Sequence, residues 1–108
     1  MMVVRVYKAD NKEYMVMDGT QGFLPEAAAV RLLMHRRHGV GADRLLVFTG
    51  SEEVPSFVAF TPEGEQQELT SADYAVLSRS REDYEIHLTD HFLGRLRAAA
   101  ASRAVCAG

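Results

Sequence analysis

The sequence predicts an α+β fold, and three features support that expectation. Short apolar segments with strand-like alternation recur along the chain, and each is bounded by turn-forming residues. Residues 25–38 and 90–103 instead carry helix-forming residues with apolar positions at helical spacing. Between the first of these helices and the next strand the chain reads HGVGAD, with two glycines in a tight turn. A chain of 108 residues has the size of one domain, so we expect residues 1–108 to form a single unit.

The N-terminal segment predicts a β-hairpin. Val4 and Val6 share one face of a first strand, and residues 10–12 (DNK) are a turn signal. A second apolar run over residues 14–17 follows and ends at an Asp-Gly pair.

The next element is expected to be a helix from Pro25 to His38. Proline fits the first turn of a helix because the amide hydrogen that it lacks would have no partner there. The apolar positions form a core face made of Ala29, Val30, Leu33 and Met34. We expect residues 35–38 (HRRH) to place positive charge in the last turn, and Gly39 to supply a left-handed C-terminal cap.

The middle of the chain predicts three strands. Residues 45–48 (LLVF) show little alternation, which is typical of a strand buried on both faces. Residues 56–60 and 66–69 are expected to pair with each other across a turn over residues 61–64, which has proline in its second position and glycine in its fourth.

Two further helices are predicted, one after Thr70 and one near the C-terminus. Thr70 and Asp73 have the spacing of a capping box, which predicts a helix through Leu77. Residues 84–88 alternate like a strand. The helix over residues 90–103 would then either cover an open sheet edge or mediate a dimer.

Composition excludes several classes of partner. The formal net charge is -3, so nothing attracts the chain generally to nucleic acid or to an anionic membrane. No apolar run approaches the roughly 20 residues needed to cross a bilayer, and the N-terminus lacks the pattern of a signal peptide. The single cysteine, Cys106, rules out an intrachain disulfide. We therefore expect a cytoplasmic protein.

Four consecutive blocks of the sequence are similar to blocks of one known family. Residues 14–18 (YMVMD) match a strand of the type FVVID, and residues 38–47 match GVGADQLL. Residues 57–64 (FVAFTPEG) match FRIFNADG, and residues 66–77 stand where a strand leads into CGNG and a helix. In this order the blocks resemble the N-terminal half of diaminopimelate epimerases, over residues 4–79.

The resemblance implies a diaminopimelate epimerase-like half-domain. Its strongly curved sheet, mixed or antiparallel, would wrap round the short helix after Thr70 as the central helix. The helix over residues 25–38 would pack outside. The strand and helix over residues 84–104 have no counterpart in that half and are extra elements.

In that family one cysteine removes the α-proton of an amino acid, and a second, from the other half of the enzyme, reprotonates the opposite face. The resemblance puts Thr70 at the position of the first cysteine, and a hydroxyl cannot act as an unaided base near neutral pH. Substrate-contact positions of the family are also replaced, at Lys12, Arg44, Thr61 and Ser71. A chain of this length has room for one half only, so we expect no catalytic residue and no cofactor.

The replaced positions leave a new binding role open. Lys12 and Arg44 would lie on loops that converge in the family fold, where they could hold a small anion. The alternative is that Arg44 is a surface charge. Asp73, in the first turn of its helix, would compete with an anion at that helix end. Arg31 and residues 35–38 could also form an anion site, or they could neutralise a helix C-terminus.

No metal site is expected. His87, Asp90 and His91 have ligand-like spacing. However, His87 lies on a predicted strand and His91 on a predicted helix, so the two imidazoles need not share a face.

Three functions are compatible with these observations, and the sequence favours the first. It is a non-catalytic, epimerase-like domain that forms an isologous homodimer, because a lone half exposes the surface that normally meets its counterpart. Its cleft would bind a small anionic metabolite or nothing. The second is an isomerase-related enzyme that uses Asp10, Glu13 or Asp43 in place of cysteine. The third is a protein-interaction or regulatory subunit.

Overall fold

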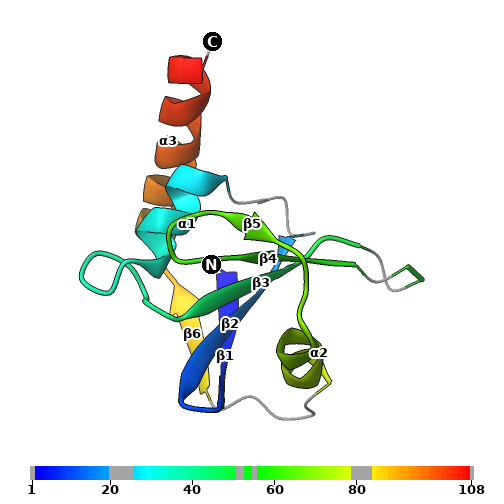
Figure 1. The fold of residues 1–108 in the computed structure, drawn as a ribbon. Helices are drawn as coiled ribbons and strands as arrows, with labels where there is room; N and C mark the ends of the chain where they lie inside the picture. Colours follow the sequence, from blue (N-terminus) through cyan, green and yellow to red (C-terminus); the bar gives the residue numbers. More distant parts are fainter. Residues whose placement is uncertain (1, 20–25, 51–52, 55, 79–83, 108) are drawn as a thin grey trace.

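The computed structural model describes residues 2–19, 26–50, 53–54, 56–78 and 84–107, and these residues form an α+β fold (Figure 1). Six strands make one mixed sheet in the order β5-β4-β3-β2-β1-β6. The strands are β1 (Met2–Ala9), β2 (Lys12–Asp18), β3 (Arg44–Phe48), β4 (Phe57–Phe60), β5 (Gln66–Gln67) and β6 (Tyr84–Leu88). The helices of the described residues are α1 (Ala27–Met34), α2 (Ser71–Leu77) and α3 (Asp90–Ala107). The predicted α+β class is confirmed.

The predicted N-terminal hairpin is present. Strands β1 and β2 are antiparallel, and their pairing ends at Ala9 and Lys12. The two residues between them, Asp10 and Asn11, have φ angles of 52° and 63°. A two-residue turn with both φ angles positive matches the right-handed twist of a hairpin, and Asp and Asn tolerate that conformation better than most residues.

Strand β3 lies inside the sheet, as its apolar run predicts. It pairs with β2 in parallel and with β4 in antiparallel orientation. Leu45 and Val47 point into one core cluster and Leu46 into another, and all three are fully buried. The β2–α1–β3 connection therefore places the starts of two neighbouring strands at one end of the sheet.

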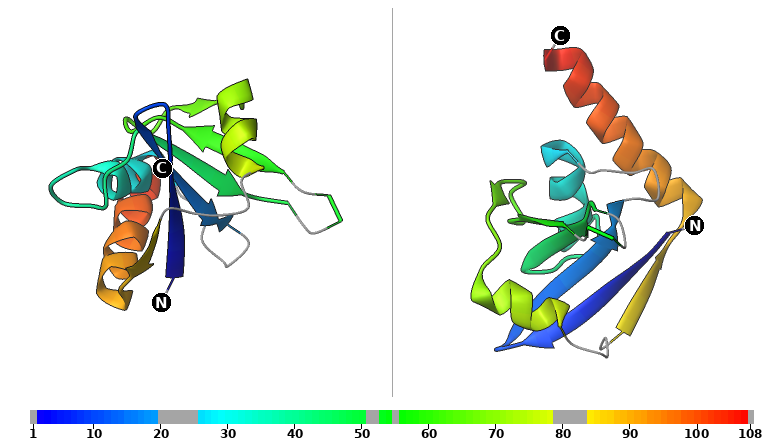
Figure 2. Two further views of the ribbon diagram at one scale, coloured as in Figure 1. Left: turned by 90° about the horizontal axis from the view of Figure 1, so that it is seen from below. Right: turned by 90° about the vertical axis from the view of Figure 1, so that its right-hand side faces the viewer.

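The helices cover opposite faces of the sheet (Figures 1 and 2). The larger core lies under α1 and α3 and includes Val4, Met15, Met17, Val30, Leu33, Leu45, Val47, Leu93 and Leu96. A smaller cluster lies under α2 and consists of Tyr14, Leu46, Ala59 and Val76. We expected the sheet to wrap round the helix after Thr70, but most apolar side chains are buried on the opposite face. A seven-residue helix has too little apolar surface to cover a sheet of this size.

Helix α3 packs against α1 over a sheet face and not along a sheet edge. Its buried side chains, Leu93 and Leu96, belong to the larger core. It begins where the Thr89 hydroxyl accepts a hydrogen bond from the Phe92 amide at 3.2 Å. Its C-terminal part extends beyond α1 (Figures 1 and 2). In the described ranges, no helix has the length and apolar character needed to cross a membrane.

Helix α1 is shorter than predicted. It spans Ala27–Met34, and Pro25 lies outside the described residues. His35 has extended backbone, and its Nδ1 atom accepts hydrogen bonds from the amides of Arg37 and His38, each at 3.1 Å. The expectation that these basic residues form the last helical turn is wrong, because the His35 side chain competes for amides that a helix would use.

Gly39 is needed for close packing and not as a left-handed cap. Its φ angle is not in the positive range, whereas that of Gly41 is +79°. A β-carbon on Gly39 would lie 2.0 Å from the carbonyl oxygen of Leu32. The returning chain therefore crosses directly over the end of α1, and only glycine leaves room for it.

Candidate functional site

Three of the five predicted site residues line one pocket. Lys12 begins β2 and Arg44 begins β3, and these strands start at the same end of the sheet because they run parallel. Thr70, the N-cap of α2, joins them. The pocket has a volume of about 360 Å³ and is lined by Lys12, Tyr14, Asp43, Arg44, Thr70 and Ala72. The two basic residues thus lie at strand ends, although we expected them on loops.

The other two predicted residues lie elsewhere. Thr61 belongs to the turn between β4 and β5, where its hydroxyl accepts a hydrogen bond from the amide of Glu65 at 3.1 Å. Its carbonyl oxygen accepts from the amide of Gly64 at 3.0 Å, as expected for a tight turn. Ser71 is the exposed first residue of α2 and does not line the pocket. Neither residue lines the pocket that Lys12, Arg44 and Thr70 share.

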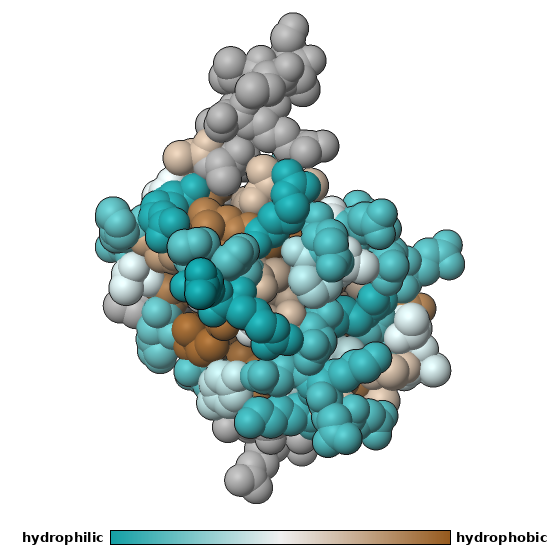
Figure 3. All heavy atoms as spheres, turned by 60° about the vertical axis from the view of Figure 1, so that its left-hand side comes forward, coloured by the Kyte–Doolittle hydropathy of each residue, from teal (hydrophilic) through white to brown (hydrophobic). Residues whose placement is uncertain are grey.

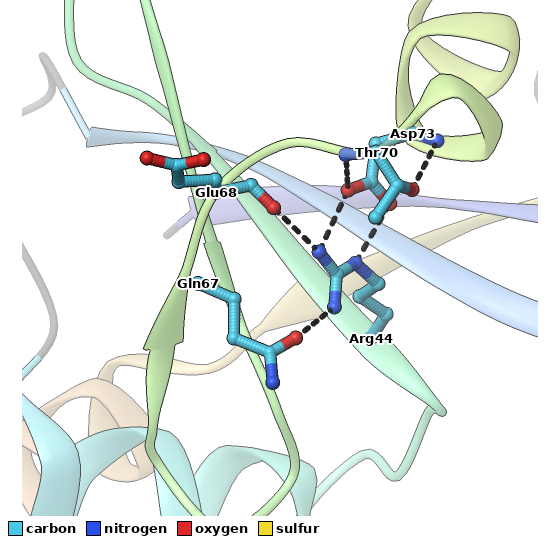
Figure 4. Close-up of polar contacts among 5 residues, drawn as sticks. All are labelled: Arg44, Gln67, Glu68, Thr70 and Asp73. Atoms are coloured by element: carbon cyan, nitrogen blue, oxygen red, sulfur yellow. Dashed lines mark hydrogen bonds and ion pairs between the residues drawn. The ribbon is translucent and has the colours of Figure 1, made fainter.

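The Arg44 guanidinium is held by three other residues of the chain (Figure 4). Its Nε and Nη2 atoms donate to the two carboxylate oxygens of Asp73, each at 2.7 Å. Nη1 donates to Oε1 of Gln67 at 2.7 Å, and Nη2 donates to the carbonyl oxygen of Glu68 at 3.2 Å. The Arg44 side chain is 16% exposed and that of Asp73 is 0% exposed. This is a bidentate ion pair with little access to solvent, the geometry in which arginine binds a carboxylate most strongly.

Asp73 joins this ion pair to the start of α2. Its Oδ2 atom accepts a hydrogen bond from the Thr70 amide at 2.8 Å, and the Thr70 hydroxyl accepts one from the Asp73 amide at 3.2 Å. These two bonds form the predicted capping box. Burial raises the pKa of Asp73, but hydrogen bonds from Arg44 and from the Thr70 amide, with the Arg44 charge, outweigh it and hold the pKa below its usual value. The buried carboxylate is therefore ionised at neutral pH.

The ion pair gives Arg44 a partner within the chain, at the position where the sequence suggested a small anion. Its donors are directed at Asp73, Gln67 and Glu68, and not at the pocket that it lines. The alternative, that Arg44 is a surface charge, is wrong, because its side chain is largely buried. The guanidinium donates four hydrogen bonds within the chain, which gives Arg44 a structural role.

Lys12 is the other basic residue that lines the pocket. It is exposed, and no ion pair joins its ammonium group to another of the residues that the structure describes. A lone, hydrated ammonium group at the rim of a concave surface can attract a small anion, but by itself it provides little specificity.

Asp43 and Glu13 are tied to each other and to the loop after α1. The amide of Asp43 donates to the carbonyl oxygen of Glu13 at 2.9 Å, and the amide of Glu13 donates to Asp43 Oδ2 at 2.8 Å. Asp43 Oδ1 accepts from Arg36 at 3.0 Å. The Glu13 carboxylate accepts from the hydroxyl of Tyr84. The Asp43 carboxylate therefore holds the backbone of Glu13 in place, and the Glu13 carboxylate connects β2 to β6 through Tyr84.

The basic cluster of Arg31 and residues 35–38 does not form one site. Arg36 pairs with Asp43, whereas Arg31 lies on α1 and reaches the carbonyl oxygen of Glu63 at 3.5 Å. His35 binds backbone amides of its own turn. The basic side chains therefore bind separate parts of the molecule and do not converge on one point.

His87, Asp90 and His91 do not gather around a common point. His87 lies on β6, and the other two lie in the first turn of α3. In the portion of the chain with described coordinates, no group of three or more potential metal ligands comes together.

The polar cluster around Arg44 includes two residues that sequence reasoning missed, Gln67 and Glu68. Gln67 is the last residue of the short, polar strand β5 and Glu68 follows it, and neither belongs to a motif. The one signal that pointed to the cluster was the capping-box spacing of Thr70 and Asp73. That spacing predicts the cap of α2, but it does not predict the ion pair of Asp73 with Arg44. The ion pair depends on which strand lies next to the helix, and a sequence does not show which elements are neighbours.

Comparison with known proteins does not assign the chain to a family. No family model matches the sequence, and no curated protein matches it either. The similarity to diaminopimelate epimerases therefore rests on the residues that carry the four blocks.

We predict that Arg44 and Asp73 are energetically coupled. Arg44→Met leaves a buried carboxylate without its counter-charge and should lower the free energy of unfolding by about 3–5 kcal/mol. Asp73→Asn keeps a capping oxygen but loses the charge, so it should lower the free energy of unfolding by about 2 kcal/mol. The double variant should be more stable than the sum of the two losses implies, by about 2 kcal/mol. Urea unfolding followed by circular dichroism measures all four proteins, and strictly additive losses would contradict the prediction.

The lowered pKa of Asp73 predicts a specific loss of stability in acid. A carboxyl with a lowered pKa in the folded state stabilises the fold in full above its unfolded pKa of about 3.9, and the contribution disappears as the pH falls through the folded value. The difference in unfolding free energy between the wild type and Asp73→Asn should be constant from about pH 5 to 7 and narrow below about pH 4. Glu65→Gln, which changes an exposed carboxylate, is the control and should show little difference at any pH. If the difference in unfolding free energy between the wild type and Asp73→Asn is unchanged at pH 3, the pKa of Asp73 is not lowered in the folded state.

Proposed function

We propose that this chain is a non-catalytic, diaminopimelate epimerase-like domain that self-associates. The observation that carries the proposal is the arrangement at the position of the catalytic loop. There Thr70 and Arg44, which replace a catalytic cysteine and a substrate contact of the family, spend their polar groups on Asp73. In a pocket that binds substrate, such groups point toward the ligand. Here they bind Asp73 and stabilise the start of α2.

The chemistry of the replaced residues supports the absence of epimerase activity. Proton removal from an α-carbon requires a base close to the substrate with a proton affinity suited to neutral pH. The Thr70 hydroxyl is an alcohol that already accepts a hydrogen bond from a backbone amide. The Asp73 carboxylate is buried and paired. Neither group is available to a substrate in the pocket.

An enzyme that relies on other carboxylates is the second candidate, and it is less well supported. Asp43 lines the pocket, but both of its oxygens accept hydrogen bonds, from Glu13 and from Arg36. These bonds join β2, β3 and the loop after α1, which explains the acidic residue without catalysis. An interaction or regulatory subunit remains a third proposal that is compatible with self-association.

Self-association is tested by the mass of the protein in solution. We expect light scattering coupled to size exclusion to give twice the mass of 12.0 kDa at micromolar concentrations, because a single half-domain leaves surface that a second copy covers. A mass that stays at that of one chain across a hundredfold range of concentration would overturn this part of the proposal.

Ligand binding and catalysis are tested together by NMR. If a small anion binds in the pocket, inorganic phosphate or succinate should shift the amide signals around Lys12, and Lys12→Ala should weaken that binding. Lys8→Ala changes the same charge outside this pocket and serves as the control.

Catalysis is tested on the same samples in D₂O. With diaminopimelate added, the α-proton signal of the amino acid should be retained. Loss of that signal would show that the protein is an enzyme.

A further inference from the structure

The two edges of the sheet differ in how well they are protected against pairing with another strand. Edge strand β5 has two residues, which is too short to extend a sheet. Edge strand β6 has five residues and pairs on one side with β1. No other strand of the described residues lies along its outer side. It contains no lysine, proline or bulge, which are among the devices that block edge pairing.

The sequence of β6 is complementary to itself. It reads Tyr84-Glu85-Ile86-His87-Leu88. If a second copy pairs with it in antiparallel orientation about Ile86, Glu85 faces the partner's His87, and His87 faces the partner's Glu85. Tyr84 faces the partner's Leu88 in the same way, and the two Ile86 side chains meet at the twofold axis. Glu85 and His87 form an opposite-charge pair when the imidazole is protonated, and opposite-charge pairs and aromatic–aliphatic pairs directly across a ladder are both stabilising.

The two faces of β6 fit this arrangement. Glu85 and His87 point to one face of the sheet, where Arg5 of β1 also approaches Glu85 at 3.7 Å. These polar side chains are exposed and accessible to a partner. Ile86 and Leu88 point to the other face and contact the larger core. A paired second copy would therefore match polar residues with polar ones and apolar residues with apolar ones.

An apolar hollow lies beside this edge. It has a volume of about 240 Å³ and lies between the loop after α1 and the junction of β6 with α3. Its lining includes Val40, Ile86, Leu88 and Phe92. Figure 3 shows apolar surface on this side of the molecule, between hydrophilic side chains. Burial of this surface by apolar side chains of a second copy would add to the main-chain pairing.

We infer that β6 is the homodimer interface, and that two copies of this chain join their sheets by antiparallel pairing of β6 with β6. The inference rests on the proposed self-association and specifies the surface through which two copies bind. An isologous contact requires a patch that complements itself, and the alternation of β6 meets that requirement because polar positions face polar ones and apolar positions face apolar ones. A different extended peptide would have no reason to match the order Glu-Ile-His.

Charge exchange at two positions tests the pairing. His87→Glu creates an edge with two glutamates, and the double change Glu85→Lys with His87→Lys creates an edge with two lysines. In either homodimer like charges would face each other twice, so the dissociation constant should rise about tenfold or more. In a one-to-one mixture every one of these pairs joins opposite charges, so a heterodimer should form. Glu65→Lys makes a charge change next to the other edge and should leave the dimer intact.

Light scattering measures the mass of each protein and of the mixture, with circular dichroism to show that the variants are folded. Monomeric variants that form a dimer when mixed would support the interface. Variants that dimerise as tightly as the wild type, or that stay monomeric when mixed, would overturn β6 as the interface and leave self-association standing. A wild type that is monomeric at all concentrations would overturn both proposals.

Discussion

The ion pair between Arg44 and Asp73 is the interaction on which the α2 side of the molecule depends. Helix α2 has seven residues, which is too few to be stable alone, and it contributes one fully buried apolar side chain, Val76. Its position is set instead by Asp73, which binds β3 through Arg44 and caps its own helix through Thr70. Because Arg44 also binds Gln67 and Glu68, the guanidinium connects β3, the end of β5 and the start of α2.

The same ion pair determines what the neighbouring pocket can do. An arginine and a hydroxyl at the mouth of a cleft would normally indicate recognition of an anion. Here Asp73 of the chain itself engages both groups, because its buried carboxylate pairs with the guanidinium and its backbone amide donates to the Thr70 hydroxyl. A ligand would have to displace Asp73 from a site in which burial and bidentate geometry favour the internal partner. Lys12 is the basic group of this pocket that can act without breaking such contacts.

The distribution of the core explains why the opposite side of the molecule is suited to association. The main apolar cluster lies under α1 and α3, and it extends to Ile86 and Leu88 on the outermost strand. An edge strand that contacts the core on one face and carries polar side chains on the other has a defined register with a second copy. The opposite edge of the sheet has no such strand, because β5 ends after two residues.

The elements that the sequence determined by itself are those whose signals are local. The turn at Asp10 and Asn11, the capping box of Thr70 and Asp73 and the buried strand after Arg44 each depend on residues close together in the chain. Their backbone preferences and hydrogen bonds are satisfied over a few residues, so a pattern is enough to predict them.

The tertiary structure alone decided what depends on distant partners. Arg44 binds a carboxylate 29 residues away, which no spacing rule indicates. Helix α1 ends at Met34 because the chain returns across it at Gly39 and because the His35 ring takes nearby amides. The larger core forms under α1 and α3 because these helices together bury more apolar surface than α2 can. Each of these outcomes is a competition between contacts, and the sequence does not show which contacts are available until the strands have been ordered.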